Sequence, residues 1–148
     1  MLISHTDMEC LIQLVKSTQC RGVVKTPCGE LHVFENHGVI DLYKLVAEQP
    51  DSLIGATIVD KVIGRGAALL LVKGGIARAH AFTMSQGAMQ VLRDAGIDAT
   101  CDALVDHIIN RAGDGMCPVE RATLDTSDPD EAMRRIKAFL LSNGILKH

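Results

Sequence analysis

The chain has 148 residues, of which 47% are hydrophobic, and it carries a formal net charge of −3 with no Trp and one Tyr. This length predicts one domain over residues 1–148 with an aliphatic core. No cluster of Lys and Arg is present, which argues against a dedicated duplex-binding protein but leaves a pocket for one nucleotide open, because affinity for nucleic acid comes mainly from grouped positive charge. No signal peptide, transmembrane run or lipidation motif is recognisable, so we expect a cytoplasmic protein with no membrane partner.

The number and spacing of the cysteines argue against a disulfide framework. Five cysteines are present and none forms a Cys-x-x-Cys pair. An odd number in a chain without a secretion signal predicts free thiols. Four of them are interpreted as small hydrophobic residues, namely Cys10, Cys20, Cys28 and Cys101.

The first third of the chain predicts one helix and one hairpin. Asp7 is a suitable N-cap for a helix that carries an apolar stripe and runs to about Thr18. Two short β-rich runs follow at residues 23–25 and 30–34. The Pro/Gly turn at residues 26–29 lies between them, which is typical of a hairpin.

The next segment predicts a short helix and then a buried central helix. Residues 35–39 have the composition of a turn, and residues 41–48 that of a helix. Residues 52–75 are expected to form the centre of the molecule. Within them, residues 62–72 are apolar on nearly every face, which is typical of a buried helix, and Gly74-Gly75 would end it.

The start of that central helix is expected to matter for function. Asp60 is interpreted as its N-cap, followed by Lys61. Gly64 and Gly66 would fall near the first turn, where the absence of a side chain lets backbone or ligand approach closely.

The second half alternates strands and helices, which favours an α/β sheet with helices on its faces. A strand is expected over residues 77–83, and Ser85 would cap a helix over residues 86–94. A second strand follows over residues 97–105. After a glycine-rich loop, Ser127 or Asp128 would cap an amphipathic last helix that runs to Ser142.

Two segments resemble a known family. One is residues 60–71, with Asp60-Lys61-Val62 followed by Gly64-Arg65. The other is the loop from Asn110-Arg111 through Gly113 and Gly115-Met116-Cys117-Pro118 to Glu120. Together they resemble a bacterial family of uncharacterised proteins, domain-of-unknown-function family 1893. The resemblance implies a cytidine deaminase-like fold, a three-layer α/β/α arrangement with a mixed sheet between helices, and it implies no established activity.

The chain lacks the residues of a zinc-dependent deaminase. Such an enzyme needs a His or Cys with a Glu two residues later at one helix start, and Pro-Cys-x-x-Cys at the next. The corresponding starts here are Gly64-Arg65-Gly66 and Ser85-Gln86-Gly87-Ala88. We therefore expect no catalytic zinc, no other metal and no cofactor. The alternative is a zinc site built from scattered ligands such as His80, His107 and Cys117.

The deaminase-like arrangement implies a pocket onto which two helix starts converge. Helix starts present unpaired N–H groups and partial positive charge, which suit anions. The expected guest is therefore a small phosphate-bearing or carboxylated molecule, and a nucleotide-like ligand is an analogy from the fold. The residues expected to bind it are Lys61, Gly64, Arg65, Asn110, Arg111 and Gly115.

Three residues are candidates for catalysis. Cys117 precedes Pro118, so it would cap a short helix, where a thiol is a candidate nucleophile; the alternative is a buried structural thiol. Glu120 would serve either in a capping box or as a general acid or base. Asp60 has the same two alternatives, a helix cap or a proton carrier.

The sequence favours two functions over a metal-dependent deaminase with unusual ligands and a purely structural oligomer subunit. The first is a small-molecule-binding protein with a possible thiol-based active site. The second is a non-catalytic ligand sensor or partner-binding module of the same fold. Whether the protein is an enzyme and whether it forms a homo-oligomer both stay open.

Overall fold

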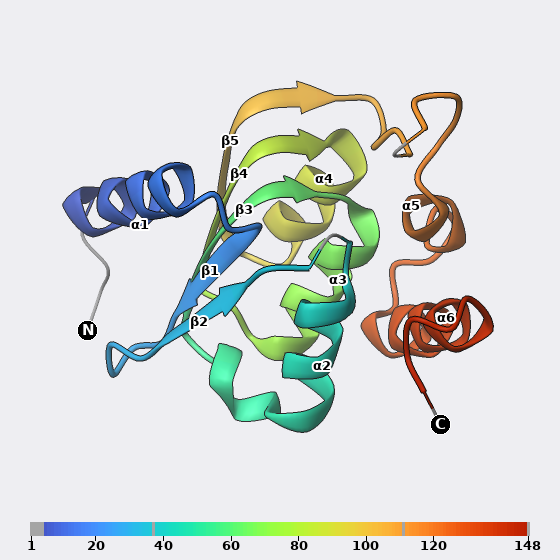
Figure 1. Ribbon diagram of the computed structural model, residues 1–148, viewed down its shortest axis with the longest axis horizontal. Helices are drawn as coiled ribbons and strands as arrows, with labels where there is room; N and C mark the ends of the chain where they lie inside the picture. The colour runs from blue at the N-terminus through green and yellow to red at the C-terminus, as the bar shows by residue number, and fades with distance from the viewer. Residues whose placement is uncertain (1–4, 37, 111, 148) are drawn as a thin grey trace.

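The fold is built around one mixed five-stranded sheet (Figure 1). The computed structural model describes residues 5–36, 38–110 and 112–147, with the backbone alone for residues 5–7. The strand order is β2-β1-β3-β4-β5. β1 pairs antiparallel with both β2 and β3, whereas β3, β4 and β5 are mutually parallel. The strands are β1 (Gly22–Lys25), β2 (Leu31–Phe34), β3 (Thr57–Ile63), β4 (Arg78–Ser85) and β5 (Asp98–Val105).

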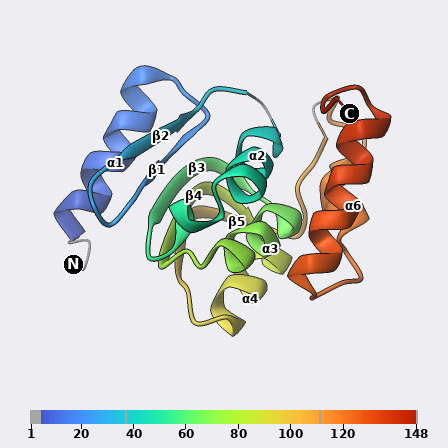
Figure 2. The same ribbon diagram turned by 90° about the horizontal axis from the view of Figure 1, so that it is seen from below.

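Helices cover both faces of this sheet, which confirms the predicted α/β architecture with a mixed sheet between helices. α1 (His5–Thr18) lies on one face, against β1 and β3. The other face carries α2 (Ile40–Glu48), α3 (Arg65–Gly74) and α4 (Gln86–Asp94), as Figure 2 shows. The short α5 (Pro118–Ala122) and the C-terminal α6 (Pro129–Ser142) pack against α3, and a 3-10 turn, η1 (Pro50–Leu53), follows α2.

Most elements lie where the sequence places them. The hairpin β1–β2 forms around the predicted turn at residues 26–29. Ser85 caps α4, since its hydroxyl accepts a hydrogen bond from the Ala88 N–H at 3.2 Å. Asp128 caps α6, accepting from the Asp130 N–H at 3.0 Å. α1 begins at His5, so Asp7 lies inside the helix instead of preceding it.

The main correction concerns residues 57–63, which form the central strand β3. Asp60 and Lys61 therefore lie in a strand, and the N-cap of α3 is Gly64, not Asp60. The segment is rich in β-branched residues, which favour a strand. Its apolar residues run directly into those of the helix, so the hydrophobic pattern does not mark where the strand ends and the helix begins. The predicted buried helix is real, but it begins at Arg65, four residues after the Lys61 that would have followed an Asp60 cap.

Two hydrophobic clusters hold the layers together. The larger one fills the space between the sheet and α2, α3, α4 and α6, and the smaller one lies under α1 and includes Val15, Val23 and Val59. No helix in the described part of the chain is both long and apolar enough to cross a bilayer.

Gly74 allows η1 to approach the end of α3, and this gives a first prediction. A Cβ at Gly74 would lie 2.5 Å from Leu53 Cδ1 and 2.8 Å from Leu53 Cβ. Leu53 is fully buried. We expect Gly74→Ala to lower the free energy of unfolding by about 1–3 kcal/mol, measured by urea denaturation.

Gly87 provides the matched control for that substitution. It is also helical, and a Cβ there would meet its nearest neighbour, Arg65 Cδ, at an ordinary 3.5 Å. Gly87→Ala should leave stability unchanged or raise it by up to about 1 kcal/mol, because Ala is the better helix former. Equal losses in both variants would contradict the steric argument.

Candidate functional site

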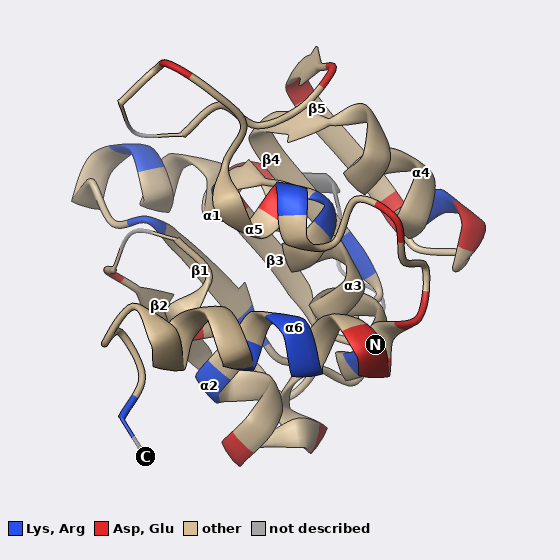
Figure 3. Cartoon of the chain, turned by 90° about the vertical axis from the view of Figure 1, so that its right-hand side faces the viewer, with Lys and Arg blue, Asp and Glu red and all other residues tan. Residues whose placement is uncertain are grey.

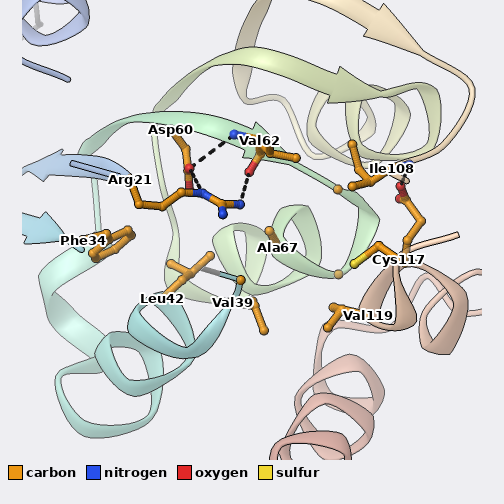
Figure 4. Close-up of a pocket in the computed structure, with 14 residues that line it drawn as sticks. Arg21, Phe34, Val39, Leu42, Asp60, Val62, Ala67, Ile108, Cys117 and Val119 are labelled. Atoms are coloured by element: carbon orange, nitrogen blue, oxygen red, sulfur yellow. Dashed lines mark hydrogen bonds and ion pairs between the residues drawn. The ribbon is translucent and has the colours of Figure 1, made fainter. Parts of the chain in front are cut away.

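A pocket of about 70 Å³ opens between the starts of α2, α3 and α5 and the end of β3 (Figure 4). It brings together all three candidate catalytic residues, Asp60, Cys117 and Glu120, and the candidate binding residue Gly64. Its walls are otherwise mainly apolar and include Phe34, Val39, Leu42, Val62, Ala67 and Val119. Segments far apart in the sequence thus meet at one small cavity.

Glu120 is a buried carboxylate that joins three segments. Only 3% of the residue is exposed. Its Oε1 accepts hydrogen bonds from the Arg65 N–H at 2.7 Å and from the Ser85 hydroxyl at 2.9 Å. Its Oε2 accepts from the Ile108 N–H. Because Arg65 opens α3 and Ser85 caps α4, the two helix starts converge on this carboxylate.

This arrangement differs from the predicted capping box. In a capping box, Glu120 would accept the N–H of Cys117, the N-cap of its own helix. The Cys117 N–H instead donates to the Ile108 carbonyl at 2.8 Å. Glu120 instead caps α3 from outside that helix, because its Oε1 accepts the Arg65 N–H.

The same carboxylate changes what the helix starts can bind. The N-terminus of α3 was expected to receive a phosphate or carboxylate from a ligand. Its first N–H is already bonded to Glu120, and the negative charge that the helix dipole favours there is supplied by the protein. The Arg65 N–H, which could have bound an anionic group of a ligand, therefore binds Glu120.

Asp60 and Arg21 form a buried ion pair at the other end of the pocket. Asp60 is 5% exposed, and its Oδ1 accepts from Arg21 Nε at 2.9 Å and from the Val62 N–H at 3.4 Å. Arg21 Nη2 also donates to the Val62 carbonyl at 3.4 Å. Burial raises the pKa of Asp60 above its ordinary value, and the neighbouring Arg21 guanidinium opposes that shift.

Arg21 is a site residue that the sequence interpretation missed. It directly precedes β1, and the pairing of β1 with β3 sets Gly22 opposite Asp60. A Cβ at Gly22 would lie 2.8 Å from the Val59 carbonyl oxygen and 3.1 Å from Asp60 Cγ, so the absence of a side chain leaves room for the carboxylate. No local motif signals the ion pair, because it depends on strand pairing across 39 residues.

Lys61 lies away from the pocket, on the face of the sheet that α1 covers. Successive side chains of a strand point to opposite faces. Asp60 and Val62 line the pocket, so Lys61 between them points the other way. It was expected next to the ligand because residues 60–61 were assigned to a helix start, where alternation does not apply.

Arg65 also points away from the cavity and fastens the segment between α5 and α6. Its Nε donates to the Thr123 carbonyl at 2.9 Å, and its Nη2 donates to the Thr126 carbonyl at 2.7 Å and the Ser127 hydroxyl at 3.0 Å. Figure 3 shows acidic residues along this segment and Lys and Arg along α6. One resulting ion pair joins Arg135 Nη1 to Asp125 at 2.6 Å.

Replacing Arg65 should loosen this segment without removing charge. In Arg65→Lys a single ammonium cannot reproduce the three-point contact. We expect a loss of about 1–2 kcal/mol in the free energy of unfolding and faster proteolysis between residues 123 and 128. Arg93→Lys, at an exposed position on α4, is the control and should change stability by less than about 0.5 kcal/mol. Unchanged proteolysis in Arg65→Lys would contradict the assignment.

The loop residues expected to bind a ligand serve the loop itself. Asn110 Oδ1 accepts from the N–H groups of Gly113 at 2.8 Å and Asp114 at 3.2 Å, and its Nδ2 donates to Asp114. The Asn110 N–H donates to the Gly115 carbonyl, which closes the turn. Neither Asn110 nor Gly115 lines the pocket. Arg111 lies outside the described residues.

Cys117 takes its predicted place at the start of α5, directly before Pro118. It is half-buried, makes no side-chain cap hydrogen bond and lines the pocket. The three scattered metal-ligand candidates do not gather at one point, because His80 lies on the α1 face of the sheet, with Nδ1 2.7 Å from Thr100 Oγ1. Within the described ranges, no three His, Cys, Asp or Glu residues are placed to hold a metal ion.

Comparison with known proteins gives a family and a fold. The family described as a domain of unknown function, DUF1893 (TM1506), matches residues 11–140. The crystal structure of a DUF1893 family protein from Thermotoga maritima superposes with a TM-score of 0.84 at 20% identity, covering 93% of this chain and 92% of that one. No curated protein matches the chain.

A weaker structural likeness involves a deaminase. It is the diaminohydroxyphosphoribosylaminopyrimidine deaminase/5-amino-6-(5-phosphoribosylamino)uracil reductase of Thermotoga maritima, with a TM-score of 0.43 and 17% identity. The match covers 65% of this chain and 35% of that protein.

Proposed function

Since the chain belongs to the DUF1893 family, whose function is unknown, we propose from its own geometry that it binds a small molecule in the pocket between α2, α3 and α5. The observation that supports this is the meeting of Asp60, Cys117 and Glu120 at one cavity with apolar walls. A concave, mainly apolar site with a few convergent polar groups is the usual form of a ligand site.

The size of the pocket limits what it encloses. A volume of about 70 Å³ holds a few non-hydrogen atoms, far less than a nucleotide. A phosphate is not the proposed ligand, because Glu120 already accepts the first N–H of α3 and places its own negative charge at that helix start. A larger ligand would bury one group here and leave the rest outside.

Cys117 is the nucleophile positioned beside the bound molecule. A thiol reaction on that molecule is one form of the proposal, and binding without turnover is the other. The bonding of Glu120 favours the second form, because its two oxygens already accept three hydrogen bonds inside the protein. A carboxylate held this way is poorly placed to exchange protons with a ligand.

Alkylation of Cys117 tests the proposal. We expect a molecule that fills the pocket to slow the reaction of Cys117 with iodoacetamide at least fivefold, while the exposed Cys10 and Cys28 react at unchanged rates. The rates are measured by mass spectrometry of the digested protein, with candidates taken from a metabolite library by thermal shift. Failure of every stabilising compound to protect Cys117 would overturn the proposal.

The variant Cys117→Ser distinguishes a protein that reacts with its ligand through the thiol from one that only binds the ligand. If the protein is a non-catalytic sensor, the variant binds the same compound with an affinity within about threefold of wild type. If the thiol reacts with the ligand, wild type forms a Cys117 adduct or releases a product, and the variant does neither.

A further inference from the structure

We infer that the pocket selects a small uncharged molecule that presents a carbonyl oxygen to Arg21, such as an amide. This inference rests on the proposed function and names its ligand class. It is carried by three features of the described residues: the free edge of the Arg21 guanidinium, the charges around the cavity, and the apolar walls.

The guanidinium of Arg21 is fixed and only partly used. Nε is held by Asp60 and Nη2 by the Val62 carbonyl, which sets the plane of the group (Figure 4). Nη1 donates no hydrogen bond to any of the described residues, and Arg21 lines the cavity. A preoriented donor in a mainly apolar pocket favours a ligand with an acceptor oxygen. Because the arginine side chain is already ordered before the ligand binds, binding loses less side-chain entropy.

The charges around the cavity oppose an anionic acceptor. Among the described residues that line the pocket, Arg21 is the one Lys or Arg, and Asp60 and Glu120 both carry carboxylates there. Asp60 already neutralises Arg21 at 2.9 Å. A ligand carboxylate or phosphate would add a third negative group to a largely buried site, where like charges repel strongly.

The same charged residues attract a cationic ligand only weakly, because both carboxylates already have partners within the protein. The oxygens of Glu120 accept hydrogen bonds from three protein donors. Asp60 is already paired with a cation, and an ammonium group would face Arg21. A neutral carbonyl accepts from Nη1 without adding charge, and a short alkyl chain fits the walls formed by Phe34, Val39 and Val119.

Three probes of similar shape test this selection: butanamide, butyrate and n-butylammonium. Each is titrated at pH 7 into the ¹⁵N-labelled full chain, and binding is read from NMR shifts of the residues that line the pocket. We expect saturable binding of butanamide in the millimolar range. Butyrate and n-butylammonium should bind at least tenfold more weakly.

The control variant fills the cavity without touching Arg21. Ala67 lines the pocket from the first turns of α3, so Ala67→Leu places an isobutyl group where the ligand would lie. The variant should keep the wild-type spectrum outside the pocket and lose butanamide binding. Its fold is checked by that spectrum, so a loss of binding cannot be confused with unfolding.

The outcomes distinguish an error in the ligand class from an error in the proposed function. If butyrate or n-butylammonium binds as tightly as butanamide and Ala67→Leu abolishes that binding, the pocket binds small molecules but the inference on ligand class is wrong. If Ala67→Leu binds every probe as wild type does, the pocket is not the site and the proposed function falls with it. If no probe binds wild type, the inference on ligand class is overturned, and the proposed function is then decided by the alkylation of Cys117.

Discussion

Glu120→Ala is expected to lower the free energy of unfolding by about 3–5 kcal/mol, with a fall in Tm on the order of 10 °C. The substitution leaves three donors without their acceptor: the N–H groups of Arg65 and Ile108 and the hydroxyl of Ser85. Hydrogen bonds to a charged acceptor are the stronger ones, and a buried donor left unpaired costs its full desolvation. Urea denaturation and thermal melting both measure the loss.

Two further variants test the cause of that loss. Glu120→Gln keeps the shape and one oxygen but sets an amide NH₂ toward one of the donors, so it should cost an intermediate amount, about 1–3 kcal/mol. Glu48→Ala removes an exposed glutamate on α2 and should change stability by less than about 0.5 kcal/mol. A loss below about 1 kcal/mol in Glu120→Ala would show that the carboxylate does not hold the two helix starts.

Arg21→Met is expected to cost about 3–5 kcal/mol near neutral pH and much less in acid. The substitution preserves much of the side-chain volume but leaves the carboxylate of Asp60 buried without its cation. Below the pKa of Asp60 the carboxyl is neutral and needs no counter-charge. The difference in unfolding free energy between wild type and Arg21→Met should therefore shrink as the pH falls.

The sign of this dependence follows from proton binding. Burial raises the pKa of Asp60 in the folded chain, and loss of Arg21 raises it further, because Arg21 lowers it. A folded state with the higher pKa binds the proton more tightly than the unfolded chain does. The stability that Asp60 contributes this way is fully present below its unfolded pKa of about 3.9 and is lost as the pH rises through the folded pKa.

Surface carboxylates act in the opposite direction. The pKa of Asp125 is lowered by Arg135 and that of Asp130 by Lys73, so their contributions are lost as the pH falls. Wild type and Arg21→Met both contain these surface carboxylates. Their contributions therefore cancel in the difference in unfolding free energy between the two proteins.

Asp60→Asn completes a double-mutant cycle. In that background Arg21→Met should cost little at any pH, because no buried carboxylate remains. A cost that is independent of pH, or unchanged by Asp60→Asn, would contradict the buried ion pair.

The sequence predicts the elements of this fold better than it predicts the site. The caps Ser85 and Asp128 and the hairpin turn are local chemistry, and the structure confirms them. The strand over residues 57–63 was missed because its apolar residues run into those of α3 without a turn. That one error put Asp60 and Lys61 in a helix and hid the alternation that separates them.

The candidate site was likewise predicted only in part from the sequence. Asp60, Cys117 and Glu120 were singled out by residue type and motif, and they do line one pocket. Arg21 carries no local signal, since its partner is brought to it by strand pairing. The partners of Glu120 lie on α3, α4 and the loop at Ile108, so spacing within the loop could suggest only a cap for its own helix.

The bonding of Glu120 also has a consequence for the order in which the chain folds. The acceptor for the start of α3 lies 55 residues further along the chain. During synthesis, β3, α3, β4 and α4 all leave the ribosome before Glu120 does. Until it arrives, the Arg65 N–H is without its buried acceptor, and water must satisfy it. We expect the β3–α4 unit to stay loose during translation and to tighten only when α5 docks.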